Sequence, residues 1–174
     1  MSASKKFHRF IFVDPNLCTG CEICEAVCSF VHDGEFNPLN TRIHRVRIEP
    51  IVNIALSCQK CEDAPCIRAC MENAIEKDEE GSIIIDKDKC TGCGFCVRAC
   101  PFGVITIHLD SRIAIACDLC ENMKEEFIDP EVGKKEPQCI IFCPKEAISL
   151  KNVEQIGEET RIDAVKRLLA EQLD

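Results

Sequence analysis

The stretch CTGCEICEAVC, residues 18–28, places four cysteines within eleven residues, in the spacing C-x2-C-x2-C-x3-C. Sixteen of the 174 residues are cysteine, and they form four groups of four with none left over. Trp and Tyr are absent. A chain so rich in cysteine and so poor in large aromatic residues needs disulfides or metal to organise it.

The four groups share one order of spacings and differ mainly in the second gap, which has two extra residues in group two and is stretched to residues 121–138 in group four. Group one is Cys18, Cys21, Cys24 and Cys28; group two is Cys58, Cys61, Cys66 and Cys70; group three is Cys90, Cys93, Cys96 and Cys100; and group four is Cys117, Cys120, Cys139 and Cys143.

The N-terminal sequence favours metal over disulfides. MSASKKFHRF lacks the apolar stretch and cleavage site of a secretory signal, and no apolar run approaches the roughly 18 residues that span a membrane. We therefore expect a cytoplasmic protein with reduced thiols, in which grouped cysteines bind metal. The net charge of −9 disfavours nucleic acid as a partner, and the acidic stretches 62–88 and 121–136 are interpreted as solvated surface.

The cysteine spacing suits a cubane [4Fe–4S] cluster, which takes one thiolate at each of four iron corners. Three corners can be wrapped by C-x2-C-x2-C, with Gly20 and Gly92 letting backbone N–H groups approach. In a helix, the fourth cysteine lies about 6 Å beyond the third, and in two-cluster bacterial ferredoxins it binds the other cluster. Cys28 is therefore predicted to serve a different centre from Cys18. Zinc held by two C-x2-C pairs is the alternative, but zinc sites rarely carry the third and fourth cysteines of this run.

This four-group pattern resembles the four-cluster ferredoxin-like subunits of molybdenum and tungsten oxidoreductases over about residues 8–150. The G-E-F-N-P and T-R-I sequences within residues 29–50 are similar to small subunits that accompany tungsten enzymes of the aldehyde ferredoxin oxidoreductase superfamily, which includes class II benzoyl-CoA reductases. The chain departs from the ferredoxin pattern at Ser29 and Met71, where Pro would follow the fourth cysteine. This departure removes no ligand.

The resemblance implies an α+β fold of tandem, nested bacterial two-cluster [4Fe–4S] ferredoxin-like domains with inserted loops and a C-terminal helix. The outer half would comprise residues 8–57 and 117–150, the inner half residues 58–116, and the extension residues 151–174. Four [4Fe–4S] clusters would be held by four ligand sets: Cys18, Cys21, Cys24 and Cys143; Cys28, Cys117, Cys120 and Cys139; Cys58, Cys61, Cys66 and Cys100; and Cys70, Cys90, Cys93 and Cys96.

Spacing alone leaves the pairing of the groups open. Between groups two and three, the sequence predicts a short strand, a turn at Glu79–Gly81 and a strand at Ser82–Asp86, as between the two motifs of a simple ferredoxin. Residues 101–116, between groups three and four, also read as a hairpin. A pairing of group three with group four is therefore not excluded by the residues themselves.

Three segments lie outside the cysteine groups. Residues 29–50, with Arg42, Arg45 and Arg47, are either a docking edge for a catalytic subunit or a solvated strand, and the charged insertion 121–138 is interpreted as a surface loop. A C-terminal helix is expected over Glu159–Leu173, packed on its own domain or on a partner. Its apolar residues at helical spacing are Ile162, Val165, Leu169 and Leu173.

The sequence contains no P-loop, no nucleotide-binding glycine fingerprint and no surplus cysteine, so we expect no catalytic activity from the chain by itself. The four histidines form no spaced set and are interpreted as structural: His8, His32, His44 and His108. All-thiolate clusters in acidic surroundings predict low reduction potentials.

The predicted function is that of an electron-transfer subunit of an anaerobic oxidoreductase. It would transfer electrons to or from a catalytic subunit with a tungsten- or molybdenum-pterin cofactor. Any flavin site would belong to a further flavin or iron–sulfur subunit. The alternatives are a linker subunit between carbon monoxide dehydrogenase and hydrogenase, a free polyferredoxin carrier and, from another class, a zinc-bound interaction module.

Overall fold

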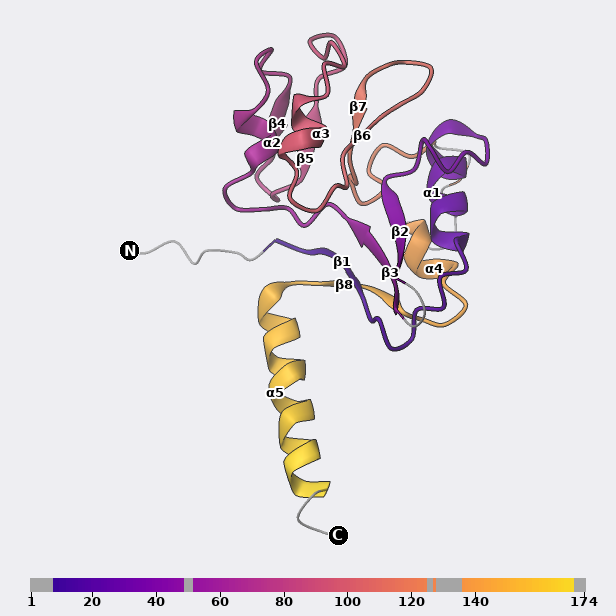
Figure 1. Ribbon diagram of the computed structural model, residues 1–174, viewed down its shortest axis with the longest axis vertical. Helices are drawn as coiled ribbons and strands as arrows, with labels where there is room; N and C mark the ends of the chain where they lie inside the picture. The colour runs from indigo at the N-terminus through magenta and orange to yellow at the C-terminus, as the bar shows by residue number, and fades with distance from the viewer. Residues whose placement is uncertain (1–7, 49–51, 125–126, 128–135, 171–174) are drawn as a thin grey trace.

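The computed structural model describes residues 8–48, 52–124, 127 and 136–170 (Figure 1). Short strands and short helices alternate along the chain, and one long helix ends it. The elements are β1 Phe10–Val13, α1 Ile23–Asp33, β2 Ile43–Ile48, β3 Val52–Ser57, α2 Pro65–Arg68, β4 Ile75–Lys77, β5 Ile83–Ile85, α3 Phe95–Ala99, β6 Thr106–Ile107, β7 Ala114–Ile115, α4 Gln138–Ile141, β8 Ile148–Lys151 and α5 Val153–Ala170.

The strands of the described chain pair two by two in antiparallel sheets. Three sheets are local hairpins: β2 with β3, β4 with β5, and β6 with β7. The fourth joins distant parts of the chain, because β1 pairs with β8 from Phe10 opposite Lys151 to Val13 opposite Ile148. The segment before group one therefore lies beside the segment after group four.

The hairpins expected on both sides of group three are confirmed. Strands β4 and β5 pair in register from Ile75 opposite Ile85 to Lys77 opposite Ile83, and the turn between them uses Gly81 in the left-handed region, at φ 82°. Strands β6 and β7 form the second hairpin. The hairpin of β2 and β3, between groups one and two, was expected only as a single strand.

Each cysteine group places its third cysteine on a short helix, and the fourth follows four residues later. Helix α3 ends at Ala99, just before Cys100 and Pro101. Helix α1 instead continues to Asp33, because Ser29 stands where the pattern has Pro and keeps its backbone N–H for the helix. The helical offset predicted for the fourth cysteine is thus confirmed for Cys28, whereas Cys70, Cys100 and Cys143 follow the ends of their helices.

One continuous core of small and aliphatic side chains runs through both sets of hairpins. Its fully buried members include Ile43 of β2 and Val104 and Ile105 before β6. Partly buried cysteines from all four groups pack against this core. The buried interior is therefore shared between the segments assigned to the outer and inner halves.

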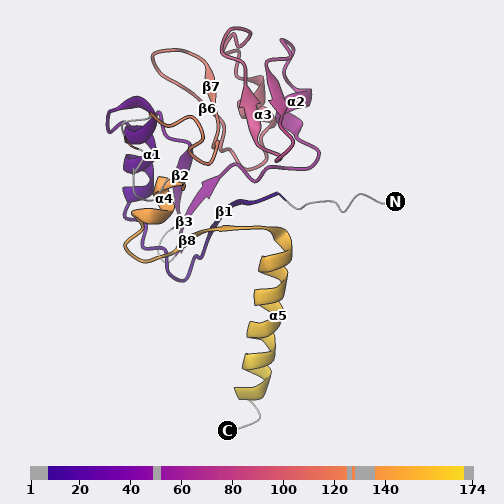
Figure 2. The ribbon, with the colours of Figure 1, turned by 180° about the vertical axis from the view of Figure 1, so that it is seen from behind.

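Helix α5 extends away from the rest of the molecule in both ribbon views (Figures 1 and 2). It begins at Val153, six residues before the expected start, because Asn152 and Gln155 cap it reciprocally through side-chain bonds to each other's backbone N–H at 2.8 and 3.0 Å. Ile162 is 48% exposed and Leu169 is 54% exposed. The expectation that this helix packs on its own domain is therefore wrong; Leu173 lies outside the described residues.

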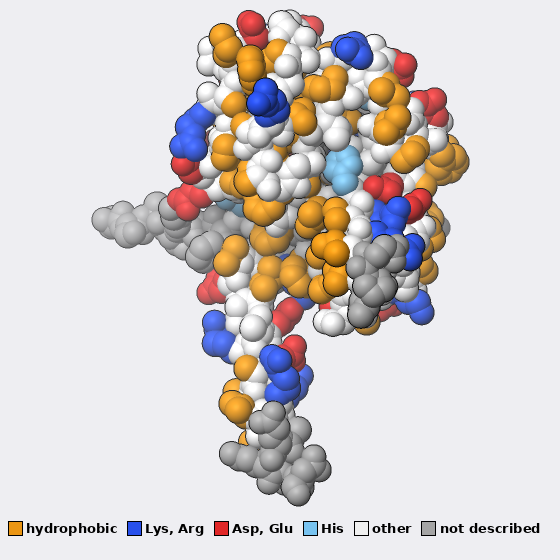
Figure 3. Space-filling view, viewed as in Figure 1, with side chains coloured by type: hydrophobic (Ala, Val, Ile, Leu, Met, Phe, Trp, Pro, Cys, Tyr) orange, Lys and Arg blue, Asp and Glu red, His pale blue; other side chains and the backbone are white. Residues whose placement is uncertain are grey.

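Most of the insertion 121–138 also lies outside the described residues. Its first part packs against α1, since Met123 is buried and the backbone N–H of Lys124 donates to Val31 O at 3.0 Å. On the face shown in Figure 3, acidic and basic side chains lie among exposed hydrophobic ones. Among the described helices, none has the length and apolar character needed to cross a membrane.

Candidate metal centres

The sixteen cysteines line four separate cavities, four to each cavity. In every case three thiols come from one group and the fourth comes from another. The first quartet is Cys18, Cys21, Cys24 and Cys143; the second is Cys28, Cys117, Cys120 and Cys139; the third is Cys58, Cys61, Cys66 and Cys100; and the fourth is Cys70, Cys90, Cys93 and Cys96.

The structure therefore brings together the same sets that the resemblance implied. It places group one with group four and group two with group three, and it does not place group three with group four. The cavities measure about 410, 290, 320 and 310 Å³ in quartet order, including space that opens to solvent. Whether each quartet binds one cluster remains a prediction.

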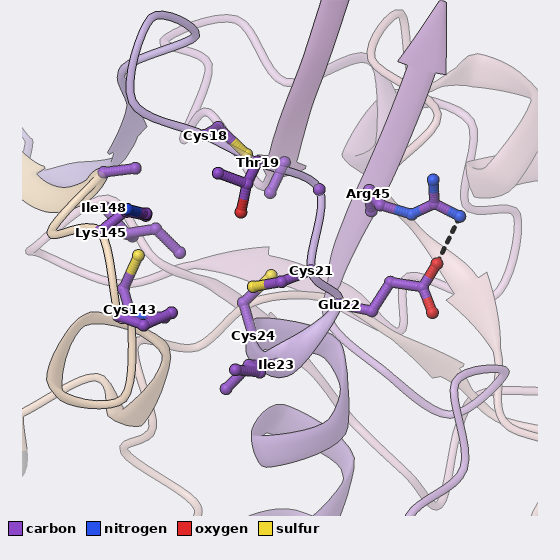
Figure 4. Close-up of a pocket in the computed structure, with 14 residues that line it drawn as sticks. Cys18, Thr19, Cys21, Glu22, Ile23, Cys24, Arg45, Cys143, Lys145 and Ile148 are labelled. Atoms are coloured by element: carbon purple, nitrogen blue, oxygen red, sulfur yellow. Dashed lines mark ion pairs between the residues drawn. The ribbon is translucent and has the colours of Figure 1, made fainter.

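The first cavity shows the arrangement most clearly (Figure 4). The thiols of Cys21 and Cys24 lie beside each other, and those of Cys18 and Cys143 lie across the same space. Ala55 and Ile148 complete an apolar wall. Thiols held apart around a cavity suit a polynuclear cluster, whereas zinc needs its ligands about 2.3 Å from one ion. Within the described residues, no three His, Cys, Asp or Glu side chains are grouped to hold a single ion.

The loops between the first two cysteines of each group share a backbone conformation. The residue just before the second cysteine has positive φ in all four: Gly20 at 69°, Lys60 at 48°, Gly92 at 67° and Leu119 at 56°. This left-handed turn folds each loop around its cavity. At Gly92 a β-carbon would also lie 1.9 Å from Arg112 O, so only glycine fits there.

Backbone N–H groups reach several of the sulfur atoms. Arg42 N donates to Cys28 Sγ at 3.3 Å, Ala74 N to Cys70 Sγ at 3.3 Å, and Ala114 N to Cys90 Sγ at 3.4 Å. Such bonds stabilise negative charge on sulfur and tune the potentials of iron–sulfur clusters.

Burial keeps most of the enclosed thiols protonated when no cation is present. It raises the pKa of Cys24 to about 12, of Cys66 to about 11 and of Cys120 to about 12. Negative neighbours, including other thiols, add to the rise at each of them. Metal binding at such thiols would release their protons, which is how metal binding couples to pH and to folding in sites of this kind.

Cys28 is the exception among the buried thiols. Burial raises its pKa, but His32, the backbone N–H of Arg42 and the Thr41 hydroxyl outweigh that effect and leave the pKa lowered. His32 lies one helical turn beyond Cys28 on α1 and pairs with Asp118. His32 is still interpreted as a structural residue. Its effect on the Cys28 thiol was not predicted from the sequence. The spacing of four residues between Cys28 and His32, one helical turn, was the signal that could have indicated it.

Three basic residues that lie near the cavities were not predicted from the sequence as site residues. Arg42 lines the second cavity and Arg45 the first, while Lys60 lies in the loop of the third quartet. Arg42 and Arg45 were expected at a docking edge together with Arg47. Only Arg47 of these three is exposed, so a docking role for this strand remains a prediction.

The donor chemistry of the quartets fits iron–sulfur clusters. Each offers four sulfur ligands around an apolar cavity, with N–H groups directed at sulfur in the second and fourth. In the second cavity the buried Nη1 of Arg42 has no hydrogen-bond partner within the described chain, and an anionic guest would supply one. Together with the α+β, ferredoxin-like fold, these features define an iron–sulfur protein of the [4Fe–4S] class.

Comparison with known proteins agrees with this class. The chain belongs to the 4Fe-4S dicluster domain family, which it matches over residues 52–153, and residues 15–31 match a 4Fe-4S binding domain. It is 37% identical to the polyferredoxin-like subunit of an aliphatic sulfonate oxidoreductase from Pyrococcus furiosus, over 69% of this chain and 70% of the relative. It is 35% identical to the putative electron transport protein YsaA of Escherichia coli, over 86% of this chain and 93% of the relative.

A solved structure, the active site complex BamBC of benzoyl coenzyme A reductase with benzoyl-CoA, contains a chain that is 25% identical. The likeness covers 95% of this chain and 98% of that one, with a TM-score of 0.49. The backbones agree too loosely for this likeness to bear on the substrate. The expected class, an iron–sulfur electron-transfer protein that is not itself the catalytic subunit, is confirmed by the family and by the curated relatives.

Proposed function

We propose that each quartet holds one [4Fe–4S] cluster and that the chain relays electrons for a separate catalytic subunit. The observation that best supports this proposal is that all sixteen thiols line four cavities. Each cavity has three thiols from one group and one from another. Bound clusters would supply one-electron redox centres, and the chain's residues would position them and tune them.

Within each half, the fourth cysteine of each group would bind the cluster of the other group, and this keeps the two clusters close together. Cys24 of the first quartet and Cys28 of the second lie on the same helix, α1, four residues and therefore about 6 Å apart along its axis. Cys96 of the fourth quartet lies on α3, and Cys100 of the third directly follows the end of that helix, where its backbone N–H donates to Cys96 O at 3.1 Å. This arrangement supports a nested pair of ferredoxin-like halves, closed by the pairing of β1 with β8.

The exposure of the thiols supports a linear order with the first and fourth quartets at the ends. Cys21 of the first quartet and Cys93 of the fourth are exposed, whereas all four thiols of the second quartet are buried. We place the second and third quartets next to each other across the two halves, an order that the electrostatic effect of Lys60 in the third loop on Glu121, next to Cys120, supports. Electrons would enter and leave where a redox partner can approach an exposed thiol.

The proposed partner is a catalytic subunit with a tungsten- or molybdenum-pterin cofactor. The G-E-F-N-P and T-R-I motifs support this choice, and so does the relative from an aliphatic sulfonate oxidoreductase. We propose a cytoplasmic complex, with any flavin supplied by a further subunit. Isolation of the native complex under anaerobic conditions, followed by tungsten and molybdenum analysis, tests the partner; elution of the chain alone would favour a free carrier.

The ligand sets are tested by iron and sulfide content and by a serine series. We expect about sixteen iron and sixteen sulfide per chain, four for each proposed cluster. Cys24→Ser and Cys143→Ser, 119 positions apart, should alter the same electron paramagnetic resonance signal. Cys28→Ser, only four residues from Cys24, should alter a different one. A shared effect of Cys24→Ser and Cys28→Ser would contradict the proposed sets.

A further inference from the structure

The four cavities differ in the buried positive charge that lies beside them. The second cavity is lined by Arg42, whose Nη1 is buried and has no hydrogen-bond partner within the described chain. No described carboxylate forms an ion pair with Arg42. Asp118 lines the same cavity and acts electrostatically on Arg42, but the ion pair that its carboxylate forms is with His32, at 3.1 Å.

Lys60 supplies a comparable charge beside the third cavity. Its side chain is buried, with the residue only 5% exposed, and Nζ donates to Ser82 Oγ at 2.6 Å. Ser82 directly precedes Ile83, which lines the cavity. Among the described residues, no carboxylate forms an ion pair with Lys60. The ammonium is therefore enclosed next to the third quartet with a hydroxyl as its hydrogen-bond partner.

One carboxylate acts on the Lys60 ammonium from a distance, that of Glu121, which follows Cys120 of the second quartet. Glu121 is exposed, so solvent screens its charge.

The side chain of Lys60 is held on a backbone that disfavours side chains. Lys60 has φ 48° at the loop position where groups one and three carry Gly20 and Gly92. A side chain in the left-handed region is disfavoured by roughly 1–2 kcal/mol. Residues held in such conformations concentrate at functional sites, where the strain is offset by another gain.

Within the described part of the chain, the first and fourth cavities lack an enclosed cation of this kind. In the first, Arg45 has a buried Nε without a partner, but its guanidinium pairs with Glu22 at 2.5 Å and points toward that carboxylate (Figure 4). Lys145 on the same wall is exposed, so solvent screens it. The fourth cavity is lined by one charged side chain, Glu72, which is negative.

A buried cation without a carboxylate partner is costly unless another anion lies close to it. A [4Fe–4S] cluster with four thiolates is such an anion, since its charge is about −2 when oxidised and about −3 after it takes up one electron. A nearby cation favours the more negative form. It therefore raises the reduction potential.

We propose that Arg42 and Lys60 hold the second and third clusters at higher reduction potentials than the first and fourth, so that electrons reside in the middle of the molecule. This inference rests on the proposed four-cluster function. Each cluster takes up one electron, and no proton transfer is required. The arrangement would let the chain store two electrons between an exposed entry and an exposed exit.

The test is an anaerobic redox titration of the full chain with dithionite, followed by electron paramagnetic resonance. Arg42→Met and Lys60→Met remove the charges. Arg47→Met is the control for Arg42, because Arg47 is exposed and lies on β2, which begins directly after Arg42. Lys89→Met is the control for Lys60, because Lys89 directly precedes Cys90, is exposed and pairs with Asp86 at 3.0 Å.

The titration of the native protein should show one reduction step for each cluster. We expect Arg42→Met to lower the potential of one of the two highest steps and Lys60→Met to lower the potential of the other. The controls should shift these potentials far less. Arg42→Lys and Lys60→Arg, which keep the charge, should return the steps toward the native values. Shifts equal to those of the controls, shifts of the two lowest steps, or failure of these charge-keeping variants to restore the native values would overturn the proposal.

Iron content separates this inference from the proposed function. Native protein with far fewer than four clusters would refute the four-cluster function itself, whereas four clusters with unmoved potentials would refute only the role of the cations. If Lys60→Met loses iron through misfolding, Lys60→Asn replaces it, because asparagine tolerates the left-handed backbone. The same shift is expected of that variant, and its absence overturns the role of Lys60.

Discussion

His32 Nε2 lies 3.1 Å from Asp118 Oδ1, and this buried pair joins α1 to the loop that begins group four. The other ring nitrogen of His32 lies 2.8 Å from Cys28 O, and Asp118 Oδ1 also accepts a hydrogen bond from Cys120 N at 3.1 Å. The pair therefore ties the loop that carries Cys117 and Cys120 to the helix that carries the fourth thiol of the same quartet.

Replacing His32 by Ala should destabilise the protein strongly. The carboxylate of Asp118 would remain buried without its charged partner, and breaking a buried pair in this way costs about 3–5 kcal/mol. Asp118→Asn should cost less, because its amide oxygen can still accept from Cys120 N. Anaerobic denaturant unfolding measures both. Equal stability of His32→Ala and the native protein would show that the pair does not hold the two segments together.

Gly92→Ala should disrupt the loop of the fourth quartet. The new β-carbon would lie 1.9 Å from Arg112 O, a backbone atom that cannot turn aside, so we expect loss of the fourth cluster's iron. Gly94→Ala is the matched control, because Gly94 also has positive φ but nothing within 4 Å of the added carbon. The control should lose only about 1–2 kcal/mol of stability, the cost of the left-handed backbone. Iron analysis and unfolding distinguish the two, and full iron retention in Gly92→Ala would contradict the expectation.

Asn40→Ala should weaken the junction between the two halves. Asn40 is fully buried, and its Oδ1 accepts a hydrogen bond from Leu109 N at 2.9 Å, across 69 positions of the chain. Removing the acceptor leaves a backbone donor unsatisfied, at a cost of about 1–3 kcal/mol. Asn37→Ala, which removes an exposed turn bond to Leu39 N, should cost less. Unfolding free energies give the comparison, and equal losses would argue against a special role for Asn40.

A chain that ends at Asn152 should keep its clusters. Helix α5 extends away from the body in Figures 1 and 2, and its described apolar residues Ile162, Val165, Leu168 and Leu169 are exposed. Its described tie to the preceding strand is the exposed Lys151–Glu159 ion pair, which contributes little. We expect unchanged iron content and unfolding midpoint. Loss of iron on truncation would mean that α5 supports the body after all.

Several local features were predictable because they depend only on neighbouring residues. The offset of four between the third and fourth cysteines predicted a helical turn, which each of the four groups contains. The hairpin around Gly81 followed from turn chemistry. The start of α5 was missed, although Asn152 and Gln155 carry a capping signal, and its exposed position could not be read from apolar spacing, which does not say what a helix packs against.

The sequence alone determined the class, an iron–sulfur protein with four spaced groups of thiols, because ligand type and local spacing are covalent properties of the chain. Only the tertiary structure decided which thiols surround the same cavity. The pairing of β1 with β8 brings Cys143 to Cys18 across 125 positions, and no local pattern distinguishes that closure from a pairing of groups three and four. The folded chain also brought Arg42 to the wall of the second cavity and buried Lys60 beside Ser82, because burial and electrostatic environment depend on residues distant in sequence.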